Sequence, residues 1–194
     1  EMSERKKIEE QALLYHLTCM GNLPSILDIG LRSRASVKGK FIDVADGEII
    51  TGREALNLQT MVPFHFFTKN PFDGRVLRDH NTKSFCIISV RRTFANENGW
   101  KVIPKHPLSS SSTVSLFDYD EGMNQIDWEL MNTRDYKNAE CKSVCMAECL
   151  SSVTVEPKNF YCIYVKNDND KKHVDGLLKK QELSIFVTVN SYMF

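Results

Sequence analysis

Several features that define other classes of protein are missing from this 194-residue chain. No run of 18 or more apolar residues occurs, so the sequence predicts no membrane-spanning helix. The charged N-terminal stretch EMSERKKIEEQ lacks the basic stub and apolar core of a secretory signal, and we therefore expect a cytoplasmic protein. Basic and acidic residues number 25 each, which excludes a global field that would attract nucleic acid. Any binding of DNA must therefore depend on local clusters of charge.

The chain has six cysteines but no C-x-x-C pair. In a cytosolic protein, cysteines at such spacings are most simply small buried hydrophobic residues. Cys141, Cys145 and Cys149 follow one another at intervals of four, which can place them on one face of a helix. No histidine or further cysteine stands at ligand spacing beside them. We therefore expect neither disulfides nor a metal site.

The common catalytic motifs are also missing from the sequence. It contains no G-x-G-x-x-G, P-loop, H-E-x-x-H or G-x-S-x-G pattern. Their absence argues against dinucleotide binding of the usual kind, phosphoryl transfer, zinc proteolysis and the nucleophile elbow of the α/β-hydrolases.

Short strands and short helices alternate along the chain, and its 42% hydrophobic and 26% charged residues are typical of one globular domain, residues 1–194. β-Branched and aromatic residues predict strands at residues 13–17, 62–67, 84–90, 146–150, 160–165 and 183–189. Helices are predicted at residues 6–14, 22–31, 125–131 and 167–180. Strands outnumber helices and lie mostly in the second half, which favours an α+β fold over a doubly wound sheet.

Two local features of the first third of the chain have a specific interpretation. The helix at residues 22–31 is predicted to begin with Asn22 as its N-cap and to end at Gly30. The following residues 32–61 are polar and loop-like, with glycines at 39, 47 and 52. A connection of this length is too long for an ordinary loop, so we expect a lid or binding element.

Two residues stand out as candidates for chemistry, each with a simpler alternative. Glu148 is a carboxylate within the apolar stretch MAECL, where burial requires a partner, a ligand or a catalytic task. A structural salt bridge explains it equally well. His16 lies in the apolar stretch LLYHL and points into a cleft or into the core. A hydrogen-bonded core histidine is the alternative.

Three blocks of the sequence resemble the DarT family of bacterial DNA ADP-ribosyltransferase toxins. The first block is LYHLTCMGNLPSILDIGLRS at residues 14–33, with its Tyr-His-x-Thr followed by an Asn-Leu-x-x-Ile-Leu helix and Gly-Leu. The second is VPFHFFTKNPF at residues 62–72. The third is MAECLSSVTVEPKNFYCIYV at residues 146–165, preceded by IDW at 126–128. The blocks come in the family's order and together extend over most of residues 13–166.

The resemblance implies a fold, a reaction and partners. The fold would be an ADP-ribosyltransferase domain related to the poly-ADP-ribose polymerases, with a central split mixed β-sheet flanked by short helices. NAD⁺ would donate ADP-ribose to a thymidine or guanosine base of single-stranded DNA, and no metal would take part. The protein would be a toxin that blocks replication and is neutralised by a macrodomain-type DarG antitoxin. The alternatives are a transferase acting on RNA or protein, and a non-catalytic nucleotide-binding module.

The resemblance also assigns roles to individual residues. Glu148 would stabilise the positive charge that develops on the ribose, and His16 would orient NAD⁺ from the opposite side of one cleft. Thr18 and Asn22, in the same block as His16, would help to bind the dinucleotide. Arg53 would contact the NAD⁺ phosphates or help to deprotonate the acceptor base, and residues 32–61 around it would form the lid over NAD⁺.

The second block is the predicted DNA-binding element. Its Phe66, Lys69 and Phe72, with Arg75 just after the block, alternate aromatic and basic side chains, and aromatic faces beside phosphate-binding cations can hold an unstacked base. Packing of the phenylalanines in the core is the alternative interpretation of the same residues.

Overall fold

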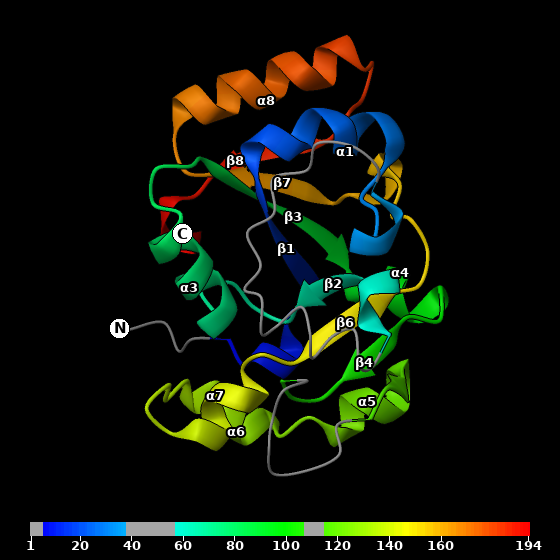
Figure 1. The fold of residues 1–194 in the computed structure, drawn as a ribbon, viewed down its shortest axis with the longest axis vertical. Coiled ribbons are helices and arrows are strands. Elements are labelled where there is room, and N and C mark those ends of the chain that lie inside the picture. Colours follow the sequence, from blue (N-terminus) through cyan, green and yellow to red (C-terminus); the bar gives the residue numbers. More distant parts are fainter. Residues whose placement is uncertain (1–5, 38–56, 107–114) are drawn as a thin grey trace.

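The computed structural model describes residues 6–37, 57–106 and 115–194 and shows one mixed eight-stranded sheet (Figure 1). The strand order is β5-β4-β6-β2-β1-β3-β7-β8, antiparallel except for the parallel pair of β7 and β8. The strands are β1 (Leu13–Cys19), β2 (Val62–His65), β3 (Phe85–Arg91), β4 (Lys101–Ile103), β5 (Phe117–Asp118), β6 (Glu148–Ser151), β7 (Cys162–Val165) and β8 (Phe186–Val189). The predicted α+β class is confirmed.

The sheet narrows sharply between β1 and β2. Strand β1 pairs with β3 along the whole of Leu13–Cys19, but it is in register with β2 at the single pair Tyr15 and His65. Strands β2, β6, β4 and β5 therefore form one half-sheet, and β1, β3, β7 and β8 form the other. This geometry confirms the predicted split sheet, and the junction of the two halves is the pair Tyr15–His65.

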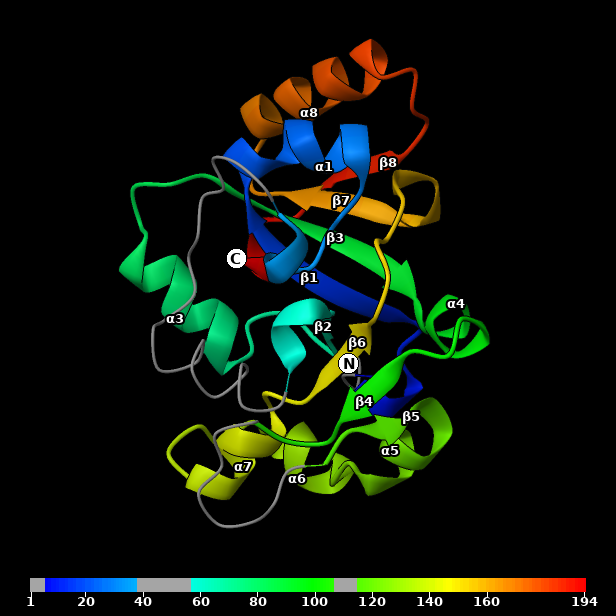
Figure 2. The ribbon, with the colours of Figure 1, turned by 45° about the vertical axis from the view of Figure 1, so that its right-hand side comes forward.

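Different helices lie at the two ends of the sheet (Figure 2). The helices are α1 (Leu23–Ile29), α3 (Pro71–Asp79), α4 (Arg92–Glu97), α5 (Tyr119–Gln125), α6 (Trp128–Thr133), α7 (Ala139–Val144) and α8 (Asp168–Lys180). Short 3-10 turns are η1 (Ile8–Glu10), η2 (Met20–Asn22), η3 (Arg34–Ser36), η4 (Leu58–Thr60), η5 (Pro157–Asn159) and η6 (Ser191–Met193). Figure 2 shows α1 and α8 beside β7 at one end, and α5, α6 and α7 at the other. No helix in these described stretches is long and apolar enough to cross a membrane.

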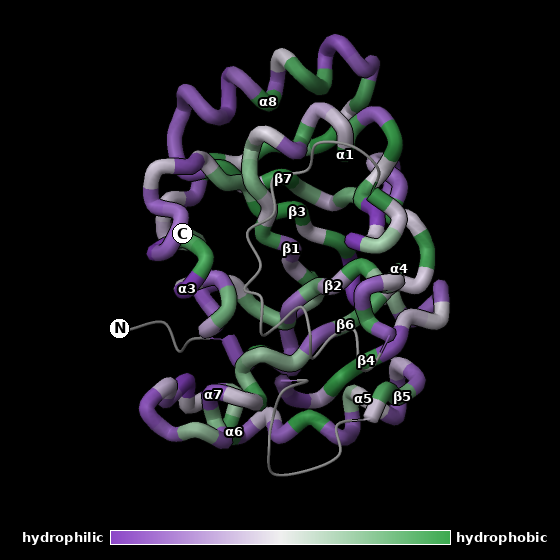
Figure 3. The backbone as a smooth tube through the Cα atoms, in the orientation of Figure 1, coloured by the Kyte–Doolittle hydropathy of each residue, from purple (hydrophilic) through white to green (hydrophobic). Residues whose placement is uncertain are grey.

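Alternation along the strands produces two apolar layers. One face of the sheet packs Phe64, Ile88 and Cys149 under α1, α8 and the α5–α7 group, and this is the main core. The other face packs Leu17, Phe85 and Ile87 against α3 and the C-terminus, with a smaller cluster where η4 meets β4 and β6. In Figure 3, α8 is largely hydrophilic in colour whereas the neighbouring strand β7 is largely hydrophobic.

Helix α1 confirms one local prediction and corrects its detail. Asn22 occupies the N-cap position, but its side chain donates to Thr18 Oγ1 at 3.5 Å and does not cap the helix. Gly30 ends α1 with a φ of 86°, a conformation that favours glycine. A Cβ there would lie 2.5 Å from Thr154 Cγ2, so a side chain would also disturb the bridge between Leu31 and Val155.

The helix predicted at residues 6–14 is wrong. Only the 3-10 turn Ile8–Glu10 forms there, and Leu13 and Leu14 belong to β1, because pairing with β3 overrides the helical pattern. The predicted strand 62–67 ends at His65, after which the chain turns through Lys69, whose φ is 58°. The sequence did not predict helices α3, α4, α5 and α7 or strands β4 and β5. The remaining helices and strands were predicted, and their ends are shifted in the structure.

Arg92, the first residue of α4, connects segments that are far apart in the sequence. Its side chain is 7% exposed, and its guanidinium donates to Glu9 O at 3.2 Å, Leu13 O at 3.2 Å and Phe66 O at 3.1 Å. The same group lies over the rings of Phe66 and Trp128, where the aromatic faces favour a cation. Arg92 thereby ties η1, the start of β1 and the residue after His65 to one point.

We predict that Arg92→Ala lowers the free energy of unfolding by at least about 3 kcal/mol, because the carbonyl of buried Phe66 and those of half-buried Glu9 and Leu13 lose a charged donor. The matched control is Arg91→Ala, since Arg91 is exposed and stacks on Tyr161, and its loss should cost less than about 1 kcal/mol. Urea unfolding measures both values. Equal losses in the two variants would contradict the role given to Arg92.

Candidate active site

Glu148 is the first residue of β6 and is buried, with 6% of its surface exposed. The observed strand therefore begins two residues later than the predicted strand 146–150. The residues before it form a turn in which Ala147 N–H donates to Val144 O. Glu148 stands directly opposite His65 of β2 on one side and Ile103 of β4 on the other. The carboxylate therefore lies at the start of its strand, beside the junction of the two half-sheets.

A row of three polar side chains crosses this junction. Tyr15 of β1 pairs with His65 of β2, and His65 pairs with Glu148 of β6. Residues that are directly opposite in antiparallel strands project to the same face, with Cβ atoms about 4.5 to 5.5 Å apart. We call Tyr15, His65 and Glu148 the junction row. Sequence reasoning did not select His65, although a histidine within the apolar stretch VPFHFF carried the same signal as His16.

The environment of His65 fixes its orientation. The side chain is 6% exposed, its Nδ1 lies 3.2 Å from Ala147 O, and its ring lies 5.4 Å from that of Phe72 at an angle of 30°. A carbonyl oxygen only accepts hydrogen bonds, so Nδ1 carries the hydrogen. In the neutral imidazole, Nε2 is then the nitrogen that carries no hydrogen.

His16 does not belong to the junction row. It follows Tyr15 in β1, and alternation turns successive side chains to opposite faces. Its Nδ1 donates to Pro63 O of β2 at 2.7 Å, and its ring lies 5.5 Å from that of Phe64. The imidazole therefore reaches across the gap where β1 and β2 diverge. Only β2 separates the strand of His16 from that of Glu148, so two residues 132 positions apart in the sequence lie two strands apart in the sheet.

The other predicted donor-binding residues lie close to His16. Thr18 is on β1 two residues beyond His16, and Asn22 follows the end of that strand. Both side chains are buried and Asn22 Nδ2 donates to Thr18 Oγ1. Their assignment to NAD⁺ stays a prediction.

Arg53 and most of the predicted lid, residues 38–56, lie outside the described residues. The two described ends of the 32–61 segment are η3 and η4, and these turns contact each other. Leu58 of η4 is fully buried in a small cluster with Ile103 and Leu150. Ile103 is the residue that pairs with Glu148, so the end of the segment packs beside the junction row.

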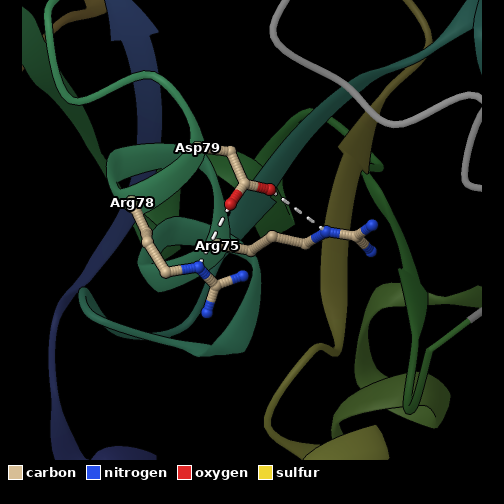
Figure 4. Close-up of polar contacts among 3 residues, drawn as sticks. All are labelled: Arg75, Arg78 and Asp79. Carbon is tan, nitrogen blue, oxygen red and sulfur yellow. Dashed lines mark hydrogen bonds and ion pairs between the residues drawn. The ribbon is translucent and has the colours of Figure 1, made fainter.

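The predicted DNA-binding residues divide into a buried and a surface group. Phe66 is 1% exposed and packs edge-on against Trp128, so its ring offers no face to a base, and this geometry corrects its predicted stacking role. Phe72 and Arg75 both belong to α3, where Phe72 is partly exposed and Arg75 is exposed. Lys69 is exposed in the turn that precedes this helix. Figure 4 shows Arg75 and Arg78 both directed at Asp79, at 3.6 and 3.1 Å. Such exposed pairs contribute little stability.

Helix α3 is anchored by a reciprocal pair of caps. Asn70 Oδ1 accepts from Asp73 N–H at 2.9 Å, while Asp73 Oδ2 accepts from Asn70 Nδ2 at 2.9 Å and from Lys69 N–H at 3.1 Å. Asp73 is 3% exposed, and this burial raises the pKa of its carboxyl to about 7. The caps fix the first turn of α3, which carries the Phe72 ring that packs on His65.

Within the described stretches, no group of three or more His, Cys, Asp or Glu side chains is arranged to hold a metal ion. All six cysteines are buried and free, as expected for small core residues. Their positions give no ligand set for the junction row. The junction row itself offers a carboxylate, an imidazole and a phenol.

The fold defined by this split sheet is that of an ADP-ribosyltransferase. Thermus sp. 2.9 DarT, in a complex with ADP-ribosylated single-stranded DNA, superposes with a TM-score of 0.80 at 18% identity, covering 98% of this chain and all of that one. The same protein in complex with NAD⁺ gives a TM-score of 0.76 at 17% identity, covering 95% of this chain and 98% of that chain. These likenesses establish the architecture.

The family follows from the sequence. The family model described as "ssDNA thymidine ADP-ribosyltransferase, DarT" matches residues 15–194, and this chain belongs to that family. A fusion of a DNA ADP-ribosyl transferase and a DNA ADP-ribosyl glycohydrolase from Thermosipho africanus (strain H17ap60334) is 26% identical over 184 residues. The match covers 89% of this chain but 47% of that relative, so the chain spans about half the length of the fusion protein.

We predict that Asp73 makes stability depend on pH. Because the folded carboxyl has a raised pKa, the folded state binds the proton more tightly than the unfolded state, so the free energy of unfolding falls as pH rises from about 4 to about 7. The slope is on the order of 1 kcal/mol per pH unit. Asp73→Asn keeps the cap geometry without the titration, and urea unfolding between pH 4 and 8 should show a flatter profile. Parallel profiles would contradict the prediction.

Proposed function

We propose that this chain transfers ADP-ribose from NAD⁺ to a nucleobase of single-stranded DNA. The observation that carries the proposal is the buried Glu148 carboxylate at the junction of the half-sheets, in a chain of the DarT family. Related structures of Thermus DarT hold NAD⁺ or ADP-ribosylated single-stranded DNA. The proposed domain spans residues 1–194 as one unit, with residues 32–61 as an NAD⁺-binding lid.

Glu148 is proposed as the catalytic carboxylate. When nicotinamide leaves, the ribose develops positive charge at its anomeric carbon and resembles an oxocarbenium ion. A carboxylate that accepts a hydrogen bond from the ribose 2′-hydroxyl stabilises this charge more in the transition state than in the ground state. Burial strengthens the effect because a low dielectric surrounds the charge.

The donor-side residues have positioning roles in this proposal. His16, at the gap between β1 and β2, orients the ribose hydroxyls, and the neighbouring Thr18 and Asn22 contribute polar groups to the NAD⁺ site. Arg53 contacts the pyrophosphate or the acceptor base, where its forked guanidinium suits phosphate oxygens. The packing of Leu58 beside Ile103 supports the lid, because it brings one end of the segment to the strand next to Glu148.

The acceptor and the biological role follow from the family. Thymidine is the first candidate base, since the family is described by it, and guanosine is the second. Lys69, Phe72 and Arg75 on and before α3 form the proposed contact with DNA. Modified bases block replication, so the chain would act as a toxin in the cytoplasm, where NAD⁺ and DNA occur together. A macrodomain-type DarG antitoxin is the proposed partner, because the Thermosipho relative carries a DNA ADP-ribosyl glycohydrolase in the same chain.

The decisive experiment is incubation with labelled NAD⁺ and single-stranded oligonucleotides of each single base and of mixed sequence. We predict that label is transferred to DNA and that Glu148→Gln lowers the rate by roughly 10² to 10³, as for loss of one electrostatic stabiliser. Glu156→Gln is the matched control, because Glu156 is exposed and precedes η5. Mass spectrometry of the product identifies the base.

The alternatives give different outcomes in the same experiment. Label on RNA or on added protein but not on DNA indicates the transferase with another acceptor. Binding of NAD⁺ without transfer indicates the non-catalytic module. Near-normal turnover by Glu148→Gln would return Glu148 to a structural role.

We also predict that His16→Ala weakens NAD⁺ binding by about tenfold, because the variant loses one orienting hydrogen bond worth roughly 1 to 1.5 kcal/mol. Calorimetric titration with NAD⁺ measures the affinity. His80→Ala, at the end of α3, should bind NAD⁺ like the wild type. Unchanged affinity in His16→Ala would show that this imidazole serves only its hydrogen bond to Pro63.

A further inference from the structure

The two edges of the sheet differ in how they are protected. Natural proteins shorten an edge strand, or place charges, prolines or bulges along it, because its unpaired main-chain groups can pair with another chain. Strand β5, at one edge, has two residues, and its Asp118 forms an ion pair with Lys101. Strand β8, at the other edge, lacks such protection. Residues 183–194 contain no charged residue and no proline, and the register of β8 with β7 is unbroken from Phe186 to Val189.

The outer edge of β8 carries the main-chain groups of Val187 and Val189. Asn190 N–H donates to Val165 O at 2.9 Å, and Val165 stands in register with Val189. In a parallel pair, the N–H and C=O of one residue point to one side of the strand and those of the next residue to the other. The even-numbered residues of β8 therefore bond to β7. The odd-numbered residues point away from it, and no strand in the described stretches lies beyond β8.

Apolar side chains accompany these main-chain groups. Phe186 is 79% exposed and Val189 is 37% exposed, while Val187 is partly buried against the main core. An aromatic ring thus stands in solvent beside N–H and C=O groups that point outward. An exposed apolar edge of this kind is a template for strand addition, in which main-chain hydrogen bonds give affinity and side chains give specificity.

We propose that β8 is a self-association edge, at which two copies of this chain pair their β8 strands antiparallel around a twofold axis. The charge distribution favours a second copy as the occupant. In a twofold interface each patch meets its own copy, so a charge near the axis would face a like charge. The absence of charged residues from 183–194 removes this repulsion, whereas a different partner would require no such neutrality.

Symmetry and the direction of the main-chain groups select the register. Opposite residues of antiparallel strands project to the same face, so a twofold axis in the middle of β8 passes through Val187 or Thr188. An axis at Val187 lets the two Val187 residues exchange both main-chain hydrogen bonds. It also places Phe186 opposite Thr188 of the second copy, so the two Phe186 rings become diagonal neighbours within contact distance. We therefore assign the axis to Val187.

The test is the oligomeric state of the purified chain, measured by analytical ultracentrifugation over a wide range of protein concentration. We expect a reversible dimer. Val187→Pro removes the outward N–H without breaking a bond to β7, and an edge strand tolerates proline in this orientation. Each dimer then loses two hydrogen bonds, so its dissociation constant should rise about 30-fold or more. Circular dichroism verifies that the variant is folded.

A second variant and a matched control complete the test. Phe186→Lys brings two cations together across the axis and should also give monomers, and it decides the question if Val187→Pro does not fold. Val153→Lys adds the same charge at an apolar side chain that is 65% exposed beside β6, in the other half-sheet, and should dimerise like the wild type.

Two outcomes would overturn the inference. One is a wild type that stays monomeric at every concentration. The other is a dimer that survives both Val187→Pro and Phe186→Lys, because its interface would then lie elsewhere. The measurement needs neither NAD⁺ nor DNA, so its result is independent of the proposed function.

Discussion

The Arg92 guanidinium holds the junction on which the rest of the structure depends. It binds the carbonyl of Leu13, two residues before Tyr15, and that of Phe66, one residue after His65. The two half-sheets pair at Tyr15 and His65, so this one buried cation fixes both strands on either side of their contact. A cation surrounded by carbonyl oxygens and aromatic faces retains favourable electrostatics in place of its hydration. The hydrogen bonds from Arg92 to Leu13 O and Phe66 O therefore set the position of the junction row relative to the core.

Much of this arrangement could be predicted from the sequence because apolar patterns are local. The strands that carry His16 and Glu148 were predicted from runs of β-branched and aromatic residues, and the family resemblance linked them. The register between strands is not local, however, and it decides which side chains share a face. No single strand shows that His65 stands opposite Glu148 or that His16 turns out of that row. The predicted helix at residues 6–14 failed for a similar reason, since pairing with β3 outweighs helix propensity.

The prediction about DNA contacts failed at Phe66 for a different physical reason. Aromatic residues between cations fit a base-stacking wall and a core equally well, and only the position at which β2 ends distinguishes them. The strand stops at His65, so Phe66 turns under Arg92 into the core and Phe72 is left on α3 against His65. The same turn that removes Phe66 from the surface therefore connects α3, the proposed DNA contact, with the junction row.

The divergence of β1 and β2 explains why polar groups gather at this point of an otherwise apolar sheet. Where two strands separate, main-chain groups that face the gap need partners other than a ladder. The His16 imidazole supplies one by donating to Pro63 O. The proposed NAD⁺ site at this gap would supply others through the hydroxyls and phosphates of the dinucleotide. Strand β2 thus lies between the two proposed functional groups, His16 on β1 and Glu148 on β6.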